Sequence, residues 1–296
     1  MLKYKSAYLK FVKKQEVPEH RFQNKIEQLD NFYLPICYKL FNYHKYKKKT
    51  LLVGLSGGQG SGKSTIAKIL KIVLKNHFML NVVNFSIDDF YKTIDQRKKM
   101  AKSIHPLFSI RGVPGTHDTK MLHNTIKNLM RKNFKKIKIP RFDKSSDERF
   151  SKKNWQKISK RPDIIIFEGW CVGANHELIT KLSNPVNILE KKEDAKLTWR
   201  KKVNNELKTK YKKIFSLIDK KIFLKIPNFK YVLKWRLIQE KKLRKKFKKK
   251  TMTSLEVKKF IMFYERITKN MIKNYKSNDI ILFIDKKHKI KSMENR

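Results

Sequence analysis

Five short apolar runs recur along the chain, and each predicts a buried β-strand. They are rich in β-branched residues and apolar on both faces, which is typical of parallel strands covered on both sides. The runs are TLLVGLSG at 50–57, VVNFSIDDF at 82–90, DIIIFEGW at 163–170, NPVNILE at 184–190 and DIILFID at 279–285. Longer segments with helical spacing, such as 63–77 and 120–134, lie between them. Alternating strands and helices predict an α/β fold with a doubly wound, mostly parallel sheet.

The same pattern suggests how the chain is organised. There is no internal repeat and no Gly/Ser linker, so we expect residues 1–296 to form a single domain. Its expected parts are an N-terminal helical extension at 1–49, a nucleotide and substrate core at 50–190, a helical insertion with a lid at 191–275, and a last strand with a tail at 276–296.

The net charge of +48 is large but says little about a specific partner. A chain this basic binds polyanions non-specifically at low salt. Nucleic-acid-binding proteins usually gather their charge on one face and interleave aromatic residues, whereas lysine here is spread from end to end. The dense block at 241–250, KKLRKKFKKK, is typical of a solvated face, with a phosphate-facing role for part of it as the alternative. We expect no specific nucleic-acid partner.

Other features indicate the compartment. No run of eighteen apolar residues is present, and the N-terminus lacks the apolar core and cleavage site of a secretory signal. Cys37 and Cys171 are the only cysteines and lack metal-ligand spacing, which suits a reducing environment. We therefore expect a cytoplasmic protein without a membrane partner.

Glycine is rare and clustered, which points to a phosphate-binding loop. Five of the nine glycines fall within residues 54–62. The segment from Gly57 to Ser64 fits G-x-x-x-x-G-K-[ST], the Walker A motif, between a predicted strand and a predicted helix. Backbone N–H groups at a helix N-terminus bind phosphate, and glycine permits their close approach. The expected nucleotide-binding residues are Gly57, Gly58, Gln59, Gly60, Ser61, Gly62, Lys63, Ser64 and Thr65, with Lys63 at the β- and γ-phosphates and Ser64 on Mg²⁺.

The remaining glycines lie in RGVPGTHD at 111–118 and FEGWCVG at 167–173. Three glycine clusters in one α/β domain should converge on one site at the carboxyl ends of the strands. Carboxylates occupy the same places: Asp88 and Asp89 end the second predicted strand, and Glu168 ends the third. The alternative for the two aspartates is that one caps a helix N-terminus and the other is its solvated neighbour. A carboxylate behind four apolar residues, as at Glu168, is costly unless it is paired or near metal.

Together these motifs resemble a known superfamily. Walker A, S-x-D-x-F-Y, P-x-F-D-x-x-x-x-x-R at 140–149 and F-E-G in this order are similar to the uridine kinase, phosphoribulokinase and pantothenate kinase superfamily. Within it, GGQGSGKST, FSIDDFY, HPLFSIRGVPGTHD, PRFDKSSDER and FEGWCVG look most like the D-glycerate 3-kinase group. The resemblance runs from about residue 50 to 240 and implies a P-loop NTPase three-layer sandwich with ATP and Mg²⁺ as cofactors.

The resemblance also implies roles for individual residues. Asp88 matches the general-base position, and Ser64 and Glu168 match the metal ligands, with Asp88 as a possible third. Helix 234–250 corresponds to a lid whose arginines close on the transferring phosphate, which makes Arg236 and Arg244 catalytic candidates beside Lys63. The usual R-x-x-R-D pattern of this helix reads R-L-I-Q-E at 236–240, so glutamine replaces the second arginine.

One departure from the uridine kinases bears on the acceptor. Their base-recognising histidine is Asp147 here, and Arg141 stands where they have an apolar residue. These changes fit a small acid better than a nucleoside. The candidate acceptor-binding residues are Arg111, His117, Arg141, Asp143, Lys144 and Arg149, of which Arg111, His117, Arg141 and Lys144 would form a carboxylate clamp. The alternatives are that Arg141 is one more basic surface residue and that His117 is a satisfied turn residue.

The favoured function is ATP-dependent phosphorylation of a hydroxyl on a small acidic metabolite, D-glycerate to 3-phosphoglycerate. One alternative is a related P-loop kinase with another small acceptor, pantothenate-like or a nucleoside. The other is a non-catalytic nucleotide- or RNA-binding protein. An intact lysine, base and metal-ligand set argues against the second alternative.

Overall fold

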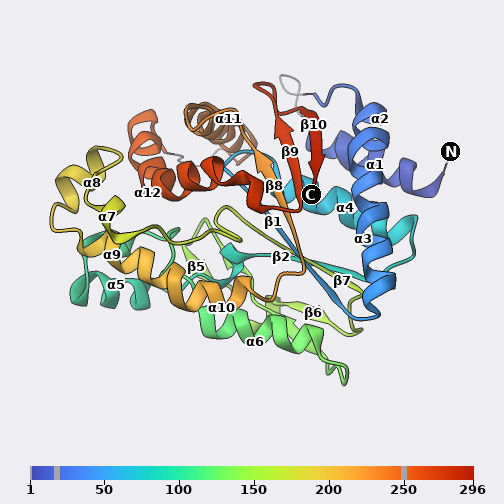
Figure 1. Ribbon diagram of the computed structural model, residues 1–296, viewed down its shortest axis with the longest axis horizontal. Coiled ribbons are helices and arrows are strands. Elements are labelled where there is room, and N and C mark those ends of the chain that lie inside the picture. The colour runs from blue at the N-terminus through green and yellow to red at the C-terminus, as the bar shows by residue number, and fades with distance from the viewer. Residues whose placement is uncertain (1, 17–20, 248–251) are drawn as a thin grey trace.

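The computed structural model describes residues 2–16, 21–247 and 252–296 (Figure 1). The end of the predicted lid helix, 248–250, lies outside the described residues.

A six-stranded sheet forms the centre of the molecule, in the order β10–β9–β8–β1–β7–β2. Its strands are β1 (Leu51–Gly57), β2 (Val82–Ser86), β7 (Ile164–Gly169), β8 (Lys220–Lys225), β9 (Ile280–Ile284) and β10 (Ile290–Asn295). All neighbours pair in parallel except β10, which runs antiparallel to β9. The predicted doubly wound, mostly parallel sheet is therefore confirmed, with β1 near its middle.

Helices cover both faces of this sheet. They are α1 (Lys3–Gln15), α2 (Lys25–Gln28), α3 (Leu34–Lys47), α4 (Lys63–Asn76), α5 (Ile94–Ser103), α6 (Thr119–Met130), α7 (Ile179–Leu182), α8 (Ile188–Glu193), α9 (Thr198–Glu206), α10 (Lys212–Phe215), α11 (Lys230–Phe247) and α12 (Ser254–Lys273). Short π-helical segments span Leu29–Tyr33 and Leu207–Tyr211. Four 3₁₀ turns lie at Ile87–Phe90, Pro106–Ser109, Lys152–Asn154 and Tyr275–Ser277.

Side chains alternate between two cores because successive strand residues point to opposite faces. On β1, Leu51, Val53 and Leu55 pack in the cluster that contains α1, α3 and α4, whereas Leu52 packs in the cluster of α6, α9, α10 and α12. Figure 1 shows α1, α3 and α4 on one side of the sheet and α6, α9 and α10 on the other. This arrangement is the predicted three-layer sandwich.

Two pairs of short strands form small sheets of their own, separate from the central sheet. β3 (Ile137–Ile139) pairs with β6 (Gln156–Ile158), and β4 (Phe142–Asp143) pairs with β5 (Glu148–Arg149), all antiparallel. The turn between β4 and β5 presents residues 144–147, the middle of the PRFDKSSDER motif. This turn is held against the end of β2, as described below.

Two strand assignments from the sequence are wrong. The segment 184–190 is not a strand: residues 184–187 are irregular and α8 begins at Ile188, because Asn187 accepts a hydrogen bond from the Glu190 N–H as a helix N-cap. The strand β8 was missed because its sequence, KKIFLK, is half lysine. Lys220 reaches Asp279 at 2.9 Å, which keeps its charge paired at the strand's start. Since β8 belongs to the central sheet, the core does not end at residue 190, and 191–275 is not wholly helical.

Among the described helices, none has the length and apolarity needed to cross a lipid bilayer.

Candidate active site

The Walker A segment forms a loop between β1 and α4. Gly60 and Gly62 have φ values of 76° and 92°, a left-handed conformation that favours glycine. A Cβ added at Gly57 would lie 2.7 Å from Leu224 Cβ, and one at Gly60 would lie 2.9 Å from Trp235 Cβ. The glycines are therefore required both by backbone conformation and by the close packing of the loop against β8 and α11.

The side chains at the start of α4 face the loop and β7. The Lys63 ammonium donates to the carbonyl of Gly58 at 2.9 Å, across the loop. The Ser64 hydroxyl donates to Glu168 Oε1 at 2.8 Å. Burial lowers the pKa of Lys63 and raises the pKa of Glu168, and the opposite charges of the two groups counteract both shifts. Lys63, Ser64 and Glu168 thus lie together, as their motifs predict.

The two aspartates after β2 have different surroundings. Ser86 caps the 3₁₀ turn at Ile87–Phe90: its hydroxyl accepts from the Asp88 N–H at 3.2 Å, while Asp89 Oδ2 accepts from the Ser86 N–H at 3.1 Å. The Asp89 carboxylate is therefore used in a reciprocal cap. The Asp88 carboxylate takes no part in the cap. The predicted N-cap alternative thus holds for Asp89, as the partner of Ser86, but not for the Asp88 side chain.

The Asp88 carboxylate instead bonds two other side chains. The Tyr91 hydroxyl donates to Asp88 Oδ1 at 2.9 Å, and the Lys144 ammonium, from the β4–β5 turn, lies 2.5 Å from Oδ2. Burial alone would raise the pKa of Asp88, but Lys144 outweighs it and holds that pKa at about 2. The contact in turn raises the pKa of Lys144. Asp88 is thus a permanent carboxylate whose nearest cation comes from a candidate acceptor-binding residue.

His117 lies beside this group but is almost fully buried, with 1% of its surface exposed. Its ring stacks on Tyr91 at 4.5 Å, and Nδ1 lies 2.6 Å from the Tyr211 hydroxyl. Burial lowers the pKa of His117 to about 3, against the attraction of Asp88, so the ring is neutral. As a satisfied turn residue, His117 would have a hydrogen-bond partner at each ring nitrogen. Nδ1 has one in Tyr211, but Nε2 forms no hydrogen bond with any described residue.

Arg111 is engaged with Asp147 rather than free in the site. Asp147, in left-handed conformation at φ 57°, accepts hydrogen bonds from Arg97 and Arg111. Arg111 also donates to the Lys144 carbonyl at 3.3 Å. Asp147 therefore fixes two arginines, and these hold the turn that carries Lys144.

The other candidate acceptor-binding residues surround the same region. Arg141 is 51% exposed, with Nε 3.8 Å from Asp89 Oδ1. Asp143 accepts from Ser145 and Ser146 within its own turn, and these bonds lower its pKa. Arg149 donates to the Tyr91 carbonyl at 2.8 Å. Asp143 and Arg149 thus shape the turn and its attachment, whereas Arg141 has an accessible guanidinium.

The two candidate lid arginines lie on α11. Arg236 bonds Gln239 at 2.8 Å and Glu240 at 2.5 Å on its own helix, and burial lowers its pKa. Arg244 is exposed. Their catalytic role stays a prediction, and the Gln239 side chain is bonded to Arg236.

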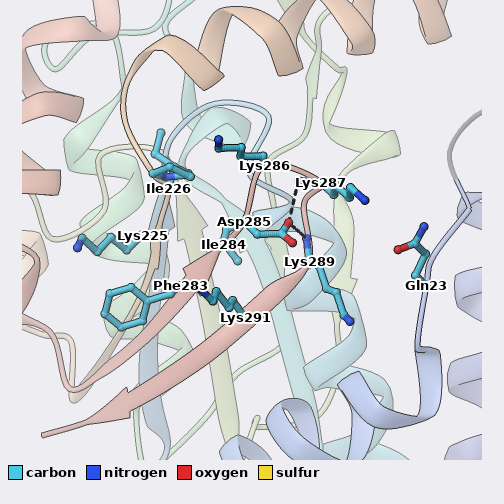
Figure 2. Close-up of a pocket in the computed structure, with 11 residues that line it drawn as sticks. Gln23, Lys225, Ile226, Phe283, Ile284, Asp285, Lys286, Lys287, Lys289 and Lys291 are labelled. Carbon is cyan, nitrogen blue, oxygen red and sulfur yellow. Dashed lines mark hydrogen bonds between the residues drawn. The ribbon is translucent and has the colours of Figure 1, made fainter.

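A cavity of about 660 Å³ lies where β8 and β9 end, next to the phosphate loop. Figure 2 shows its apolar lining, with Ile226, Phe283 and Ile284, and the lysines on its rim. His288, at the turn between β9 and β10, bonds the Gly60 carbonyl at 2.8 Å, and its ring lies tilted against Trp235 with the centroids 4.0 Å apart. This cavity was not predicted from the sequence.

The site could hold Mg²⁺ beside the phosphates. Ser64 and Glu168 supply the hard oxygen atoms that this ion prefers, and Mg²⁺ usually binds through one or two protein groups plus phosphate and water. Among the described residues no group of three or more His, Cys, Asp or Glu forms a metal cage, so the nucleotide would have to complete the coordination.

The sequence missed several residues that arrange the site. Tyr211 and Arg97 act through His117 and Asp147, while Trp235 and His288 hold the phosphate loop. None of the four lies in a recognisable motif. Burial marks three of them, with Arg97 at 2%, Tyr211 at 0% and Trp235 at 2% exposed, whereas His288 is exposed.

Comparison with known proteins agrees with the geometry. Residues 52–235 match the phosphoribulokinase/uridine kinase family. The chain is 37% identical over 138 residues to the uncharacterized kinase mug58 of Schizosaccharomyces pombe, covering 44% of this chain and 49% of that protein. It is 34% identical over 164 residues to the probable ATP-dependent kinase TDA10 of Saccharomyces cerevisiae, covering 51% and 53%. The matches thus span about half the length of these relatives.

The fold also resembles that of a D-glycerate 3-kinase from Cryptococcus neoformans. The TM-score is 0.73 at 23% identity, over 88% of this chain and 96% of that one. At this identity the likeness shows the fold alone.

Proposed function

Because the chain belongs to the phosphoribulokinase/uridine kinase family, we propose that it transfers the γ-phosphoryl group of ATP to a hydroxyl of a small acid, with D-glycerate as the favoured acceptor and 3-phosphoglycerate as the product. The observation that supports an acidic acceptor is the ion pair between Lys144 and Asp88. A cation bonded directly to the candidate base is suited to hold the carboxylate of an acceptor whose hydroxyl approaches that base.

Each residue of the site has a role in this reaction. The phosphate loop and Lys63 bind the β- and γ-phosphates. Bound Mg²⁺ would neutralise phosphate charge, with Ser64 and Glu168 holding it. Asp88, ionised at all physiological pH values, orients the acceptor hydroxyl and accepts its proton as the oxygen bonds to the γ-phosphorus and the bond from that phosphorus to the leaving ADP breaks. Lys144 and Arg141 bind the acceptor's carboxylate.

The cavity beside the loop is suited to the nucleoside end of ATP. Ile226 in its apolar lining lies next to the loop, since a Cβ at Gly58 would meet Ile226 at 2.8 Å. Lys286 and Lys289 on the rim would attract the phosphates. Charge reversal at Lys286 should raise KM for ATP, whereas reversal at the exposed Lys276 should leave it unchanged.

The proposal is tested by ADP release with a panel of D-glycerate, glycerol, pantothenate and uridine. D-Glycerate should outperform glycerol, which has the hydroxyls but no carboxylate. The Lys63→Ala variant removes the loop's ammonium group and controls for contaminating kinases. Preference for pantothenate would favour the alternative acceptor, and no turnover of any acceptor would favour the non-catalytic alternative.

A further inference from the structure

His117 is held on three sides within the acceptor region. Its backbone forms an isolated bridge with Tyr91, its ring stacks on the Tyr91 ring, and its Nδ1 meets the Tyr211 hydroxyl. The Tyr91 hydroxyl in turn donates to Asp88. The histidine is therefore fixed next to the residue that would orient the acceptor hydroxyl.

The hydrogen bonds around Tyr211 determine which nitrogen of His117 carries the proton. The Gly115 N–H donates to the Tyr211 oxygen at 3.0 Å. With its oxygen accepting from the backbone, Tyr211 has its O–H left to donate, and Nδ1 is the atom it meets. Donation in the opposite direction would leave two buried groups unpaired, the Tyr211 proton and a bare Nε2, whereas donation by Tyr211 leaves only Nε2 unpaired. Nδ1 is thus the acceptor and Nε2 carries the proton.

This assignment leaves one buried donor without a partner. Nε2 of His117 is inaccessible to solvent and forms no hydrogen bond with the described residues. An unpaired buried donor is costly, and few are tolerated in folded proteins. An oxygen atom of a bound molecule would satisfy it.

We propose that the Nε2–H of His117 donates a hydrogen bond to a carboxylate oxygen of the acceptor, and that Tyr211 is a positioning residue that fixes this tautomer. This rests on the proposed function. A carboxylate oxygen is an acceptor only, so a neutral donor in a fixed orientation recognises it without adding charge next to Asp88. The surrounding cations attract the acid, and the histidine fixes the orientation of its carboxylate.

The position of Tyr211 in the fold supports its role. It is the last residue of the π-helical segment Leu207–Tyr211, between α9 and α10. Such segments are rare and frequently occur at functional sites, because the extra residue in the turn redirects side chains. Here the segment directs a phenol from the helical layer into the acceptor region.

The first test observes the ring nitrogens directly, without an activity assay. In the full-length protein with ¹⁵N-labelled histidine, chemical shifts distinguish bare from protonated ring nitrogens, and His117→Gln identifies the resonance among the eight histidines. At neutral pH we expect a proton on Nε2 and none on Nδ1. Tyr211→Phe should shift the population toward the other tautomer. A proton on Nδ1 in the unsubstituted protein would overturn the proposal.

The second test measures kinetics with the acceptor that the panel identifies. His117→Phe keeps a stacking ring without the donor and should raise KM for the acceptor about 10- to 150-fold, the range for a hydrogen bond to a charged group, with KM for ATP unchanged. His117→Gln places an amide N–H near Nε2 and should recover part of the loss. Tyr211→Phe should raise the same KM, and less so in the His117→Gln background.

These outcomes separate the inference from the function on which it rests. Turnover of an acid with unchanged acceptor KM in His117→Phe and His117→Gln overturns the role of His117 and leaves the kinase activity standing. Equal losses for ATP and acceptor would also overturn it, because they indicate a structural role. If no acid is turned over, the proposed function fails. The proposed hydrogen bond from His117 to a carboxylate then fails as well, whichever ring nitrogen carries the proton.

Discussion

The Ser64 hydroxyl donates to Glu168 Oε1 at 2.8 Å, which joins the first turn of α4 to the end of β7. The two residues are 104 positions apart in the chain, yet the parallel pairing of β1 with β7 brings them to one edge of the sheet. The contact places a hydroxyl and a carboxylate where a nucleotide-bound Mg²⁺ would need them.

Glu168→Gln tests this placement. The amide keeps the shape of the side chain but loses the charge, so the Mg²⁺ concentration for half-maximal activity should rise about 10- to 100-fold, the scale on which disturbed metal-site partners act. The measurement is a Mg²⁺ titration at saturating nucleotide. Glu193→Gln, at an exposed residue paired with Lys259, is the matched control. An unchanged Mg²⁺ requirement would remove Glu168 from the metal site.

The second prediction separates the adjacent aspartates. Asp88→Asn should lower kcat by about 10²-fold or more, because the base is lost. Asp89→Asn should lower kcat less and keep the turn capped, because the amide oxygen can still accept from the Ser86 N–H. Asp89→Ala removes that acceptor and should destabilise the protein by about 0.5–2 kcal/mol. Steady-state kinetics and urea unfolding on the three variants give the comparison. A larger kcat loss in Asp89→Asn than in Asp88→Asn would assign the base to Asp89 instead of Asp88.

How much of this site the sequence predicts depends on the kind of interaction. The phosphate loop, Asp88 and Glu168 were predictable because backbone conformation and charge burial restrict the residues there to a few types. Tyr211 was not, because a tyrosine in a lysine-rich helical stretch has no local signature. Its role arises only when the π-helical segment meets the turn that contains His117.

The fold shows the same division. The strands of β-branched residues, such as β7, were predicted, whereas β8 was missed because lysines occupy its ends. Lys220 is paired with Asp279, and Lys225 lies 4.0 Å from the centroid of the Tyr275 ring, so tertiary partners accommodate charges that argue locally against a strand. Asn187 shows the opposite case: the apolar pattern predicted a strand there, but the Asn187 side chain caps the start of a helix.

The third prediction concerns pH. Lys144 holds the pKa of Asp88 at about 2, below its ordinary value of 3.8. A lowered pKa stabilises the folded state above the ordinary value, and this contribution is lost as pH falls from about 3.8 through about 2. Urea unfolding should therefore show the unsubstituted protein as more stable than Lys144→Met at pH 5, with the difference shrinking toward pH 2. A difference that is constant across this range would contradict the assigned ion pair.

The last prediction concerns Arg141, whose guanidinium is half exposed and 3.8 Å from Asp89. If it binds the acceptor's carboxylate, Arg141→Met should lower kcat/KM for the acid about 10- to 150-fold, because a hydrogen bond to a charged group contributes about 1.5–3 kcal/mol. KM for ATP should stay unchanged, because the phosphates are held by the loop and Lys63. Arg131→Met, at another exposed arginine, is the matched control for the loss of one positive charge from so basic a protein. Glycerol has no carboxylate, so its slower turnover should be the same in both variants and the unsubstituted protein. Glycerol turned over as well as D-glycerate, with Arg141→Met silent, would assign Arg141 to the basic surface and remove the acid from the proposed function.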